Sequence, residues 1–579
     1  MVVAAPDTAK PAEKRLTITT GEIAENTTTI RSLDWDRDRF DIEFGLQNGT
    51  TYNSYLVRGE KTALIDTSHA KFKQLYMDAL TGLIDPKEID YIVISHTEPD
   101  HSGLVKDLLE IAPQAVIVGA KVAITFLKDL VHQPFETHPI RSGDTLDLGN
   151  GHVLEFVNAP NLHWPDTIFT YDQKTGILYT CDAFGAHYCN GDTFDEDLDA
   201  LSPDFRFYYE CLMAPNARSV ISALKRMDKL GEINTIAVGH GPLIRNNLEE
   251  LTDRYRRWSN EKSKVEDMVV MFYISDYGYC DRISQALAKG ITKTGVAVEM
   301  LDMRLADPHD VTELIGRAKG IVMGMPPSSG KVAEEIQTAL SSVLAAVDKK
   351  QIFGLFESYG GDDEPIDTLH TKFQDLNLKV AFEPIRIKDT PSEALYQLCD
   401  ETGTDLGQSL VKSKKYKKIA KLDGDLQKAL GRISSGMYII TAAKGEITSA
   451  MLASWISQAS FKPLGFTVAV AKDRAIESLM QVDDTFVLNI LEEDNYAPLM
   501  KHFLKRFPPG ADRFAGIRTR PAKNKSPILA DSLAYLECKV TTRMELSDHW
   551  LVYCTVDDGK VSKDEASTAV HHRKVGNYY

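Results

Sequence analysis

The stretch His96-Thr97-Glu98-Pro99-Asp100-His101 comes just after the apolar run Tyr91-Ile92-Val93-Ile94. A short apolar run of this kind predicts a buried strand, so the polar stretch would lie in a loop at the edge of a sheet. Imidazole and carboxylate side chains gathered in such a loop are typical ligands of metal ions. The stretch therefore predicts a metal site at the end of a strand.

Three more potential ligands follow short apolar runs further along the chain. His163 comes after residues 153–157, Asp182 after residues 177–179 and His240 after residues 236–238. Loops at one edge of a sheet can bring such residues together. The set needs no thiolate, which argues against a closed structural zinc site, and its carboxylates favour harder, redox-active metal ions. The candidate metal ligands are His96, Glu98, Asp100, His101, His163, Asp182 and His240, and all except His101 are also candidate catalytic residues.

Length and composition indicate a globular protein of several domains. A chain of 579 residues, 43% hydrophobic and 26% charged, is too long for one core and predicts about three to four domains. Its 66 basic and 83 acidic residues give a net charge of −17, which argues against a nucleic-acid partner. The chain lacks an apolar stretch of membrane-spanning length, a signal-peptide pattern, and C-x-x-C spacing among its seven cysteines. We therefore expect a cytoplasmic protein in a reducing compartment, with no transmembrane segment.

The pattern of strands and helices predicts three folded units after an N-terminal tail of residues 1–30. Residues 31–262 contain short strands and the loops with the metal ligands. Residues 263–412 alternate apolar strands with helical patterns, which predicts a doubly wound parallel sheet. Residues 413–579 begin in a basic cluster that we interpret as a solvated linker. They continue with alternating Val, Ile, Thr and Ser, which is typical of a β-barrel.

Three loops of the second unit lie where an open α/β sheet binds its ligand, beyond the carboxyl ends of the strands. The first leads from a strand into a helix, whose N-terminal amides could receive a phosphate group. The other two follow the apolar runs 320–323 and 352–356. The candidate cofactor-binding residues are Ser275, Asp276, Tyr277, Gly278, Tyr279 and Cys280 in the first loop, Pro326, Pro327, Ser328, Ser329 and Gly330 in the second, and Ser358, Tyr359, Gly360 and Gly361 in the third.

The H-x-E-x-D-H pattern resembles the signature of the metallo-β-lactamase superfamily, with Glu98 where its zinc hydrolases carry a histidine. A carboxylate in place of an imidazole adds negative charge, which stabilises higher oxidation states and favours iron over zinc. The whole ligand set resembles that of the flavodiiron proteins. This resemblance implies that His96, Glu98 and His163 hold one iron ion, that Asp100 and His240 hold a second, and that Asp182 bridges the two. Ligation by His101 stays open.

The second unit resembles flavodoxin, which implies that Tyr359 stacks on the isoalloxazine ring of FMN. Flavodoxins usually end the first loop with Asn or Ser and then Thr, whereas Tyr279 and Cys280 stand here. A thiol is a weaker hydrogen-bond donor to phosphate than a hydroxyl, and Asp276 adds negative charge beside a dianion. We therefore expect weak retention of FMN.

The third unit resembles the NAD(P)H:flavin oxidoreductase domains, which are split β-barrels. The resemblance rests on residues 429–441, 448–455 and 458–463 in this order, followed by Asp548-His549. It implies that FMN or FAD binds here and that NADH or NADPH reduces it, with the nicotinamide stacked over the flavin. The candidate flavin-binding residues are Ser449, Met451, Ser454, Trp455 and Ser460.

Taken in order, the three units resemble the three-module flavodiiron proteins of cyanobacteria and other oxygenic phototrophs. The fold class implied is a metallo-β-lactamase-like αββα sandwich, a flavodoxin-like doubly wound sheet and a flavin reductase-like split β-barrel. The function implied is NAD(P)H-dependent reduction of dioxygen to water at a non-haem di-iron centre, with electrons passing through flavin, as a photoprotective electron sink. The resemblance also implies a head-to-tail homodimer, or a heterodimer with a related flavodiiron protein.

Other functions stay open on the sequence alone. The same iron pair could prefer nitric oxide as its substrate. The first unit could be a zinc hydrolase attached to flavin domains, although Glu98 argues against this. Alternatively, the protein could be a non-catalytic subunit whose flavin site has decayed at Tyr279 and Cys280. NADH, NADPH and a reduced ferredoxin all stay open as donors, because the chain has no G-x-G-x-x-G motif to examine.

Overall fold

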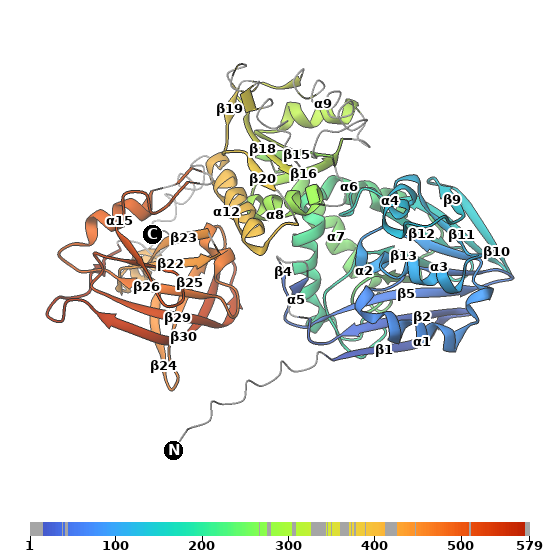
Figure 1. The fold of residues 1–579 in the computed structure, drawn as a ribbon, viewed down its shortest axis with the longest axis horizontal. Helices are drawn as coiled ribbons and strands as arrows, with labels where there is room; N and C mark the ends of the chain where they lie inside the picture. Colours follow the sequence, from blue (N-terminus) through green and yellow to red (C-terminus); the bar gives the residue numbers. More distant parts are fainter. Residues whose placement is uncertain are drawn as a thin grey trace. The chain divides into compact units, whose positions relative to one another are not determined.

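A computed structural model describes residues 15–573, except 38, 41–43, 266, 275–278, 304–307, 326–342, 344–345, 349, 359–369, 372, 374, 376–377, 388–389, 412–424, 446, 506 and 509–510 (Figure 1). The chain divides into two compact units, Met1–Lys264 and Val265–Tyr579. Among the described residues, no helix combines the length and the apolar character needed to cross a membrane.

Two mixed sheets make the first unit. In the first sheet the strand order is β1 (Leu16–Ala24), β2 (Thr27–Asp34), β5 (Thr50–Arg58), β6 (Thr62–Ile65), β7 (Tyr91–Ile94), β8 (Val116–Ala120) and β9 (Thr137–Ile140). In the second the order is β10 (Thr145–Gly149), β11 (His152–Asn158), β12 (Ile168–Asp172), β13 (Ile177–Cys181) and β14 (Thr235–Val238). Each sheet buries apolar residues on both faces, so each must be covered on both sides.

Apolar layers on either side of each sheet give the first unit four layers. Val93 of the first sheet and Phe156 of the second belong to one buried cluster, which lies between the sheets. A second cluster joins the first sheet to α1 (Lys73–Leu83), α3 (Val105–Ile111) and α4 (Lys121–Val131). A third joins the second sheet to α5 (Leu198–Tyr208), α6 (Ala217–Met227) and α7 (Leu248–Ser263). This is the predicted αββα sandwich.

The predicted tail of residues 1–30 was wrong in its second half. β1 and the start of β2 lie within it, and β2 pairs with β5 over its whole length, from Thr27 opposite Val57 to Asp34 opposite Thr50. Leu16 and Ile18 alternate with threonines and pack against the cluster beneath α1. This alternation is the pattern of a half-buried edge strand, which a tail would not need.

A parallel sheet opens the second unit. Its strand order is β16 (Ala297–Asp302), β15 (Met268–Tyr273), β17 (Gly320–Met325), β18 (Ile352–Ser358) and β19 (Lys379–Val380), with β20 (Ile385–Ile387) also paired to β18. The chain leaves β15 toward one side for β16 and returns to the other side for β17. The predicted first and second loops follow β15 and β17, at this topological switch point. The predicted doubly wound sheet is therefore present.

Two helices of the second unit, α8 (Tyr279–Lys293) and α12 (Glu393–Leu410), pack together at very short range. A Cβ on Gly403 would lie 2.2 Å from the Leu287 carbonyl oxygen, and a Cβ on Gly290 would lie 2.1 Å from that of Asp400. Glycine at these positions is what lets the two backbones approach each other. A further helix of this region, α9, spans Pro308–Arg317.

An antiparallel barrel completes the second unit. Its strand order is β23 (Ile447–Ala453), β22 (Tyr438–Lys444), β26 (Thr485–Ile490), β29 (Ala534–Glu545), β30 (His549–Val561), β25 (Leu464–Ala471) and β24 (Ile456–Phe461). Val468, Phe486 and Val552 belong to its buried core. The 3-10 helix η5 (Ala475–Leu479) and α15 (Tyr496–Leu504) lie between barrel strands in sequence. The barrel agrees with the split-barrel prediction.

Candidate functional site

All seven candidate metal ligands meet in one buried cluster of the first unit. His96 follows the end of β7, and the short helix α2 (Pro99–Ser102) then carries Asp100 and His101. Asp182 directly follows β13, and His240 follows β14. Because β13 and β14 are parallel neighbours, their carboxyl ends lie side by side and bring Asp182 close to His240.

One oxygen of Asp182 faces the first group of ligands. Its Oδ2 lies 2.7 Å from His163 Nε2 and 3.1 Å from His96 Nε2. The carboxylate of Glu98 completes this group, with Oε2 at 3.0 Å from His163 Nε2 and 3.3 Å from His96 Nε2. The three residues therefore surround a single point next to Asp182.

The other oxygen of Asp182 faces the second group. Its Oδ1 lies 3.0 Å from His101 Nε2 and 3.2 Å from His240 Nε2. Asp100 Oδ2 is 3.3 Å from the same His240 nitrogen. Asp182 thus stands between two groups of nitrogen and oxygen atoms, with one oxygen for each. His101, whose role the sequence left open, belongs to the second group.

The cluster is built to receive positive charge. Burial alone would raise the pKa of Glu98, but the His163 imidazole beside it lowers that pKa to about 2. Burial likewise would lower the pKa of His163, but Glu98 and Asp182 raise it to about 10. Within the described residues, the ion-pair partners of Glu98, Asp100 and Asp182 are all histidines. The buried carboxylates therefore depend on cationic charge placed among them.

The orphaned oxygens of Asp100 provide a test of metal fit. Both are buried and neither accepts a hydrogen bond of good geometry, although His101 Nε2 lies 3.5 Å from Oδ1 and His240 Nε2 lies 3.3 Å from Oδ2. A buried carboxylate in this state carries a large desolvation cost unless a cation binds it. Ligand atoms of the cluster lie within 4.8 Å of one another in each of its groups. The donor set thus fits two hard metal ions that share Asp182.

Residues that hold the imidazoles in place were missed by the sequence analysis. His240 Nδ1 donates a hydrogen bond to the Thr51 carbonyl oxygen at 2.6 Å, and His96 Nδ1 lies 3.2 Å from Cys181 Sγ. His187, buried beside His240, bonds through Nδ1 to Thr50 Oγ1 at 2.8 Å. Cys181 and His187 stand close to Asp182 in sequence, which was an available signal. No sequence pattern indicated that the backbone carbonyl of Thr51, on β5, would contact His240.

Most of the predicted FMN-binding residues of the second unit lie outside the described residues. These are Ser275, Asp276, Tyr277, Gly278, Pro326, Pro327, Ser328, Ser329, Gly330, Tyr359, Gly360 and Gly361. Tyr279 and Cys280 begin α8, where Cys280 is fully buried, and Ser358 ends β18. Their roles in binding stay predictions.

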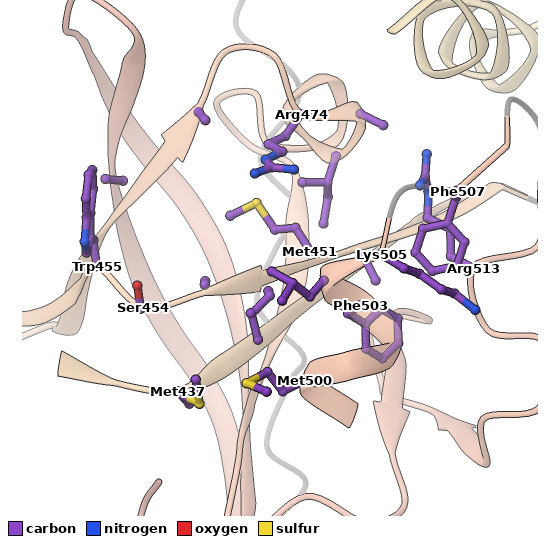
Figure 2. Close-up of a pocket in the computed structure, with 18 of the residues that line it drawn as sticks. Met437, Met451, Ser454, Trp455, Arg474, Met500, Phe503, Lys505, Phe507 and Arg513 are labelled. Atoms are coloured by element: carbon purple, nitrogen blue, oxygen red, sulfur yellow. The ribbon is translucent and has the colours of Figure 1, made fainter. Parts of the chain in front are cut away.

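A pocket opens in the barrel, lined by predicted and unpredicted residues. Met451, Ser454 and Trp455, which are predicted flavin-binding residues, line it, and His549 packs on the Trp455 ring with centroids 5.0 Å apart. Figure 2 shows Trp455 and Ser454 at one end, Lys505, Phe507 and Arg513 at the other, and Met451 and Arg474 between them. The basic residues at the second end were not predicted.

Two predicted flavin contacts are absent from the lining of this pocket. Ser449 is fully buried on β23, and Ser460 lies further along β24, where its Oγ bonds to Tyr553 Oη at 2.7 Å and to the Pro463 carbonyl at 2.6 Å. Ser449 directly precedes the lining residues Ala450 and Met451, and Ser460 lies five residues beyond Trp455. The roles of Ser449 and Ser460 in flavin binding stay predictions.

Comparisons with known families match each region of the chain. Residues 50–241 match the ODP family beta lactamase, residues 271–403 match flavodoxin, and residues 430–578 match the flavin reductase like domain. These matches agree with the sandwich, the doubly wound sheet and the barrel, and they confirm the predicted fold class. The finer boundaries 31–262, 263–412 and 413–579 stay our proposal.

Proteins similar over the whole length indicate one family. Diflavin flavoprotein A 1 of Synechocystis is 66% identical over 569 residues, covering 98% of this chain and 99% of that protein. Putative diflavin flavoprotein A 3 of Nostoc is 64% identical over 568 residues, with the same coverage of 98% and 99%. The solved structure of the metal-soaked Flv1 flavodiiron core from Synechocystis is 37% identical, with a TM-score of 0.65, and covers 69% of this chain and 100% of that one. The chain therefore belongs to the diflavin flavoprotein A family of flavodiiron proteins, oxidoreductases that here combine a metallo-β-lactamase-like, a flavodoxin-like and a flavin reductase-like domain.

Proposed function

We propose that this protein reduces dioxygen to water at a di-iron centre, with electrons that pass from NADH or NADPH through flavin. One observation carries the proposal: Asp182 directs one carboxylate oxygen to each of two ligand groups. A shared carboxylate is the arrangement that holds two metal ions side by side, close enough to act on one small substrate.

The ligands divide between the two ions as follows. His96, Glu98 and His163 would hold one, Asp100, His101 and His240 would hold the other, and Asp182 would join them. Glu98 supports iron over zinc, because a carboxylate suits a metal that changes its oxidation state better than a further imidazole does. When bound, the iron pair would supply the dioxygen-binding and electron-transfer chemistry.

The chain's own residues position these ligands and exclude water. The Thr51 carbonyl fixes the tautomer of His240, leaving Nε2 for the metal, and Cys181 Sγ contacts His96 Nδ1 at 3.2 Å on the side away from the ligand group. All seven residues are at most 5% exposed, so few waters can compete for the centre. A preformed site of this kind loses little free energy to ordering when it binds metal.

The electron path is proposed from the domain order. FMN in the flavodoxin-like domain would pass electrons to the iron centre, and FMN or FAD in the pocket of the flavin reductase-like domain would receive them from the nicotinamide. Flavin supplies hydride acceptance and single-electron release, while the protein sets position and environment. A role as an electron sink in a phototroph follows from the cyanobacterial relatives. Pairing of two chains, so that one chain's FMN serves its partner's irons, is part of this proposal.

The variant Asp182→Ala tests the shared carboxylate. Because both groups of ligands use Asp182, we expect loss of both iron ions per chain and of dioxygen uptake, with flavin content unchanged. Elemental analysis, flavin absorbance and an oxygen electrode measure the three quantities. Asp172→Ala is the matched control, since Asp172 is a buried carboxylate of the same domain that pairs with His152. Iron and uptake retained by Asp182→Ala would refute the bridge.

Anaerobic assays with nitric oxide and assays with dioxygen decide the substrate. With the same reduced donor, we expect faster consumption of dioxygen. Faster consumption of nitric oxide would replace our choice of substrate while leaving the di-iron centre in place.

A further inference from the structure

The pocket of the flavin reductase-like domain has a wall that comes from the flavodoxin-like domain. Asp405 and Gln408 of α12 line it together with Arg474, Lys505 and Arg513. These two α12 residues are three positions apart, so they lie on one face of the helix. That face points at the end of the pocket where the basic residues gather.

Asp405 holds the segment that carries Lys505 and Phe507. Its Oδ2 accepts a hydrogen bond from Arg513 Nη2 at 2.5 Å, and Glu401, one helical turn earlier, places Oε2 at 4.0 Å from Arg513 Nε. The Arg513 guanidinium lies 5.2 Å from the centre of the Phe507 ring, and Lys505 Nζ lies 5.1 Å from the same centre. Arg513 is only 7% exposed, so this contact is a buried one.

A second set of contacts holds the Arg474 side of the pocket. Gln408 Nε2 donates to the carbonyl oxygen of Asp473, the residue before Arg474. Lys293 of α8 joins the same region by bonding Asp400 Oδ1 of α12 at 2.7 Å and Glu477 Oε2 of η5 at 2.8 Å. Ala475 and Ile476 of η5 also line the pocket. Helix α12 therefore contacts both the segment that carries Arg513 and the segment that carries Arg474.

The charges of the pocket suit an anion at this end. The described lining residues include three basic side chains, Arg474, Lys505 and Arg513, and one carboxylate, that of Asp405, which pairs with Arg513. Lys505 and Arg513 lie at this end, and Arg474 lies nearer the middle (Figure 2). Trp455 at the opposite end, with Met451 between the two ends, suits a flat aromatic ring (Figure 2). A ring at one end and basic groups at the other match a planar ligand with a phosphate tail.

We propose that α12 completes this pocket and positions its basic end for the phosphate of a flavin mononucleotide, with Asp405 and Gln408 as positioning residues. The inference rests on the proposed flavin site of this domain and deepens it, since it selects a monophosphate ligand. It also links the two domains. A ligand that binds better when α12 is docked must, by reciprocity, strengthen the docking of α12.

The test uses the full-length chain, stripped of flavin and titrated calorimetrically with FMN and with riboflavin, which lacks the phosphate. Trp455→Leu identifies the binding phase that belongs to this pocket. In that phase we expect Asp405→Asn to raise the Kd for FMN about tenfold, which corresponds to about 1.4 kcal/mol, and to change that for riboflavin less than about twofold. Asp405→Glu, which keeps the charge, should restore most of the FMN affinity.

Asp531→Asn is the matched control, because Asp531 forms an exposed ion pair with Arg518 in the same domain. If Asp405→Asn does not fold, Gln408→Leu takes its place with the same expected split between FMN and riboflavin. If the Kd rose equally for FMN and riboflavin, or for neither, the proposed role of α12 would be wrong. The proposed flavin site of the domain would still stand. If Trp455→Leu altered no binding phase, the pocket would not bind flavin, and the proposed electron input would fail with it.

Discussion

At the scale of single residues, we propose that Glu98 sets the metal preference of the first domain. It lies 3.0 Å from His163 Nε2 and 3.3 Å from His96 Nε2, at the position where zinc hydrolases of similar pattern carry a histidine. We predict that Glu98→His lowers the ratio of iron to zinc in the purified protein, because a neutral ligand no longer stabilises the higher oxidation state. Elemental analysis after growth with both metals measures the ratio. A variant with the iron content of the wild type would contradict this role.

At the scale of elements, the close packing of α8 against α12 supports both the flavodoxin-like domain and the proposed shared pocket. We predict that Gly403→Ala lowers the free energy of unfolding by about 1–3 kcal/mol, because the new Cβ would lie 2.2 Å from the Leu287 carbonyl oxygen. Gly316→Ala in α9 is the control. No heavy atom of the described chain lies within 4 Å of its Cβ, so it should be neutral or stabilise by about 0.5–1 kcal/mol. Urea unfolding of the full chain measures both, and equal midpoints would show that the helices separate easily.

At the scale of the whole molecule, the second unit should lose stability as the pH rises toward neutrality. Burial raises the pKa of Glu401 from 4.5 to about 7 and that of Asp405 from 3.8 to about 6. For an acid with a raised pKa in the folded state, the favourable contribution is complete below the unfolded pKa and is lost as the pH passes the folded one. We predict a decline between about pH 4 and 7, on the order of 3 kcal/mol for Glu401. Glu401→Gln should reduce this decline in the free energy of unfolding, measured by unfolding curves at several pH values. An unchanged dependence on pH would contradict the role of Glu401.

The clustering of the candidate metal ligands could be predicted because the ligands follow the ends of strands in the sequence. His96, His163, Asp182 and His240 each follow a short apolar run, and parallel or adjacent strands bring their ends together. The predicted tail failed because β1 is an edge strand whose alternation was overlooked. Ser449 and Ser460 do not line the barrel pocket, because a motif identifies a hairpin without saying which of its side chains face a cavity, and their roles in flavin binding stay predictions.

By itself, the sequence determined the order of the three domains and the residue types of the candidate metal ligands, and it predicted a preference for iron, since these follow from residue type and local pattern. Only the tertiary structure decided that His101 faces Asp182, that the Thr51 carbonyl and Cys181 hold the imidazoles, and that α12 reaches the barrel pocket. The physical reason is sequence separation. Asp405 and Arg513, or Lys293 and Glu477, meet through the packing of whole elements, and no local period or propensity records which distant charges will be buried together.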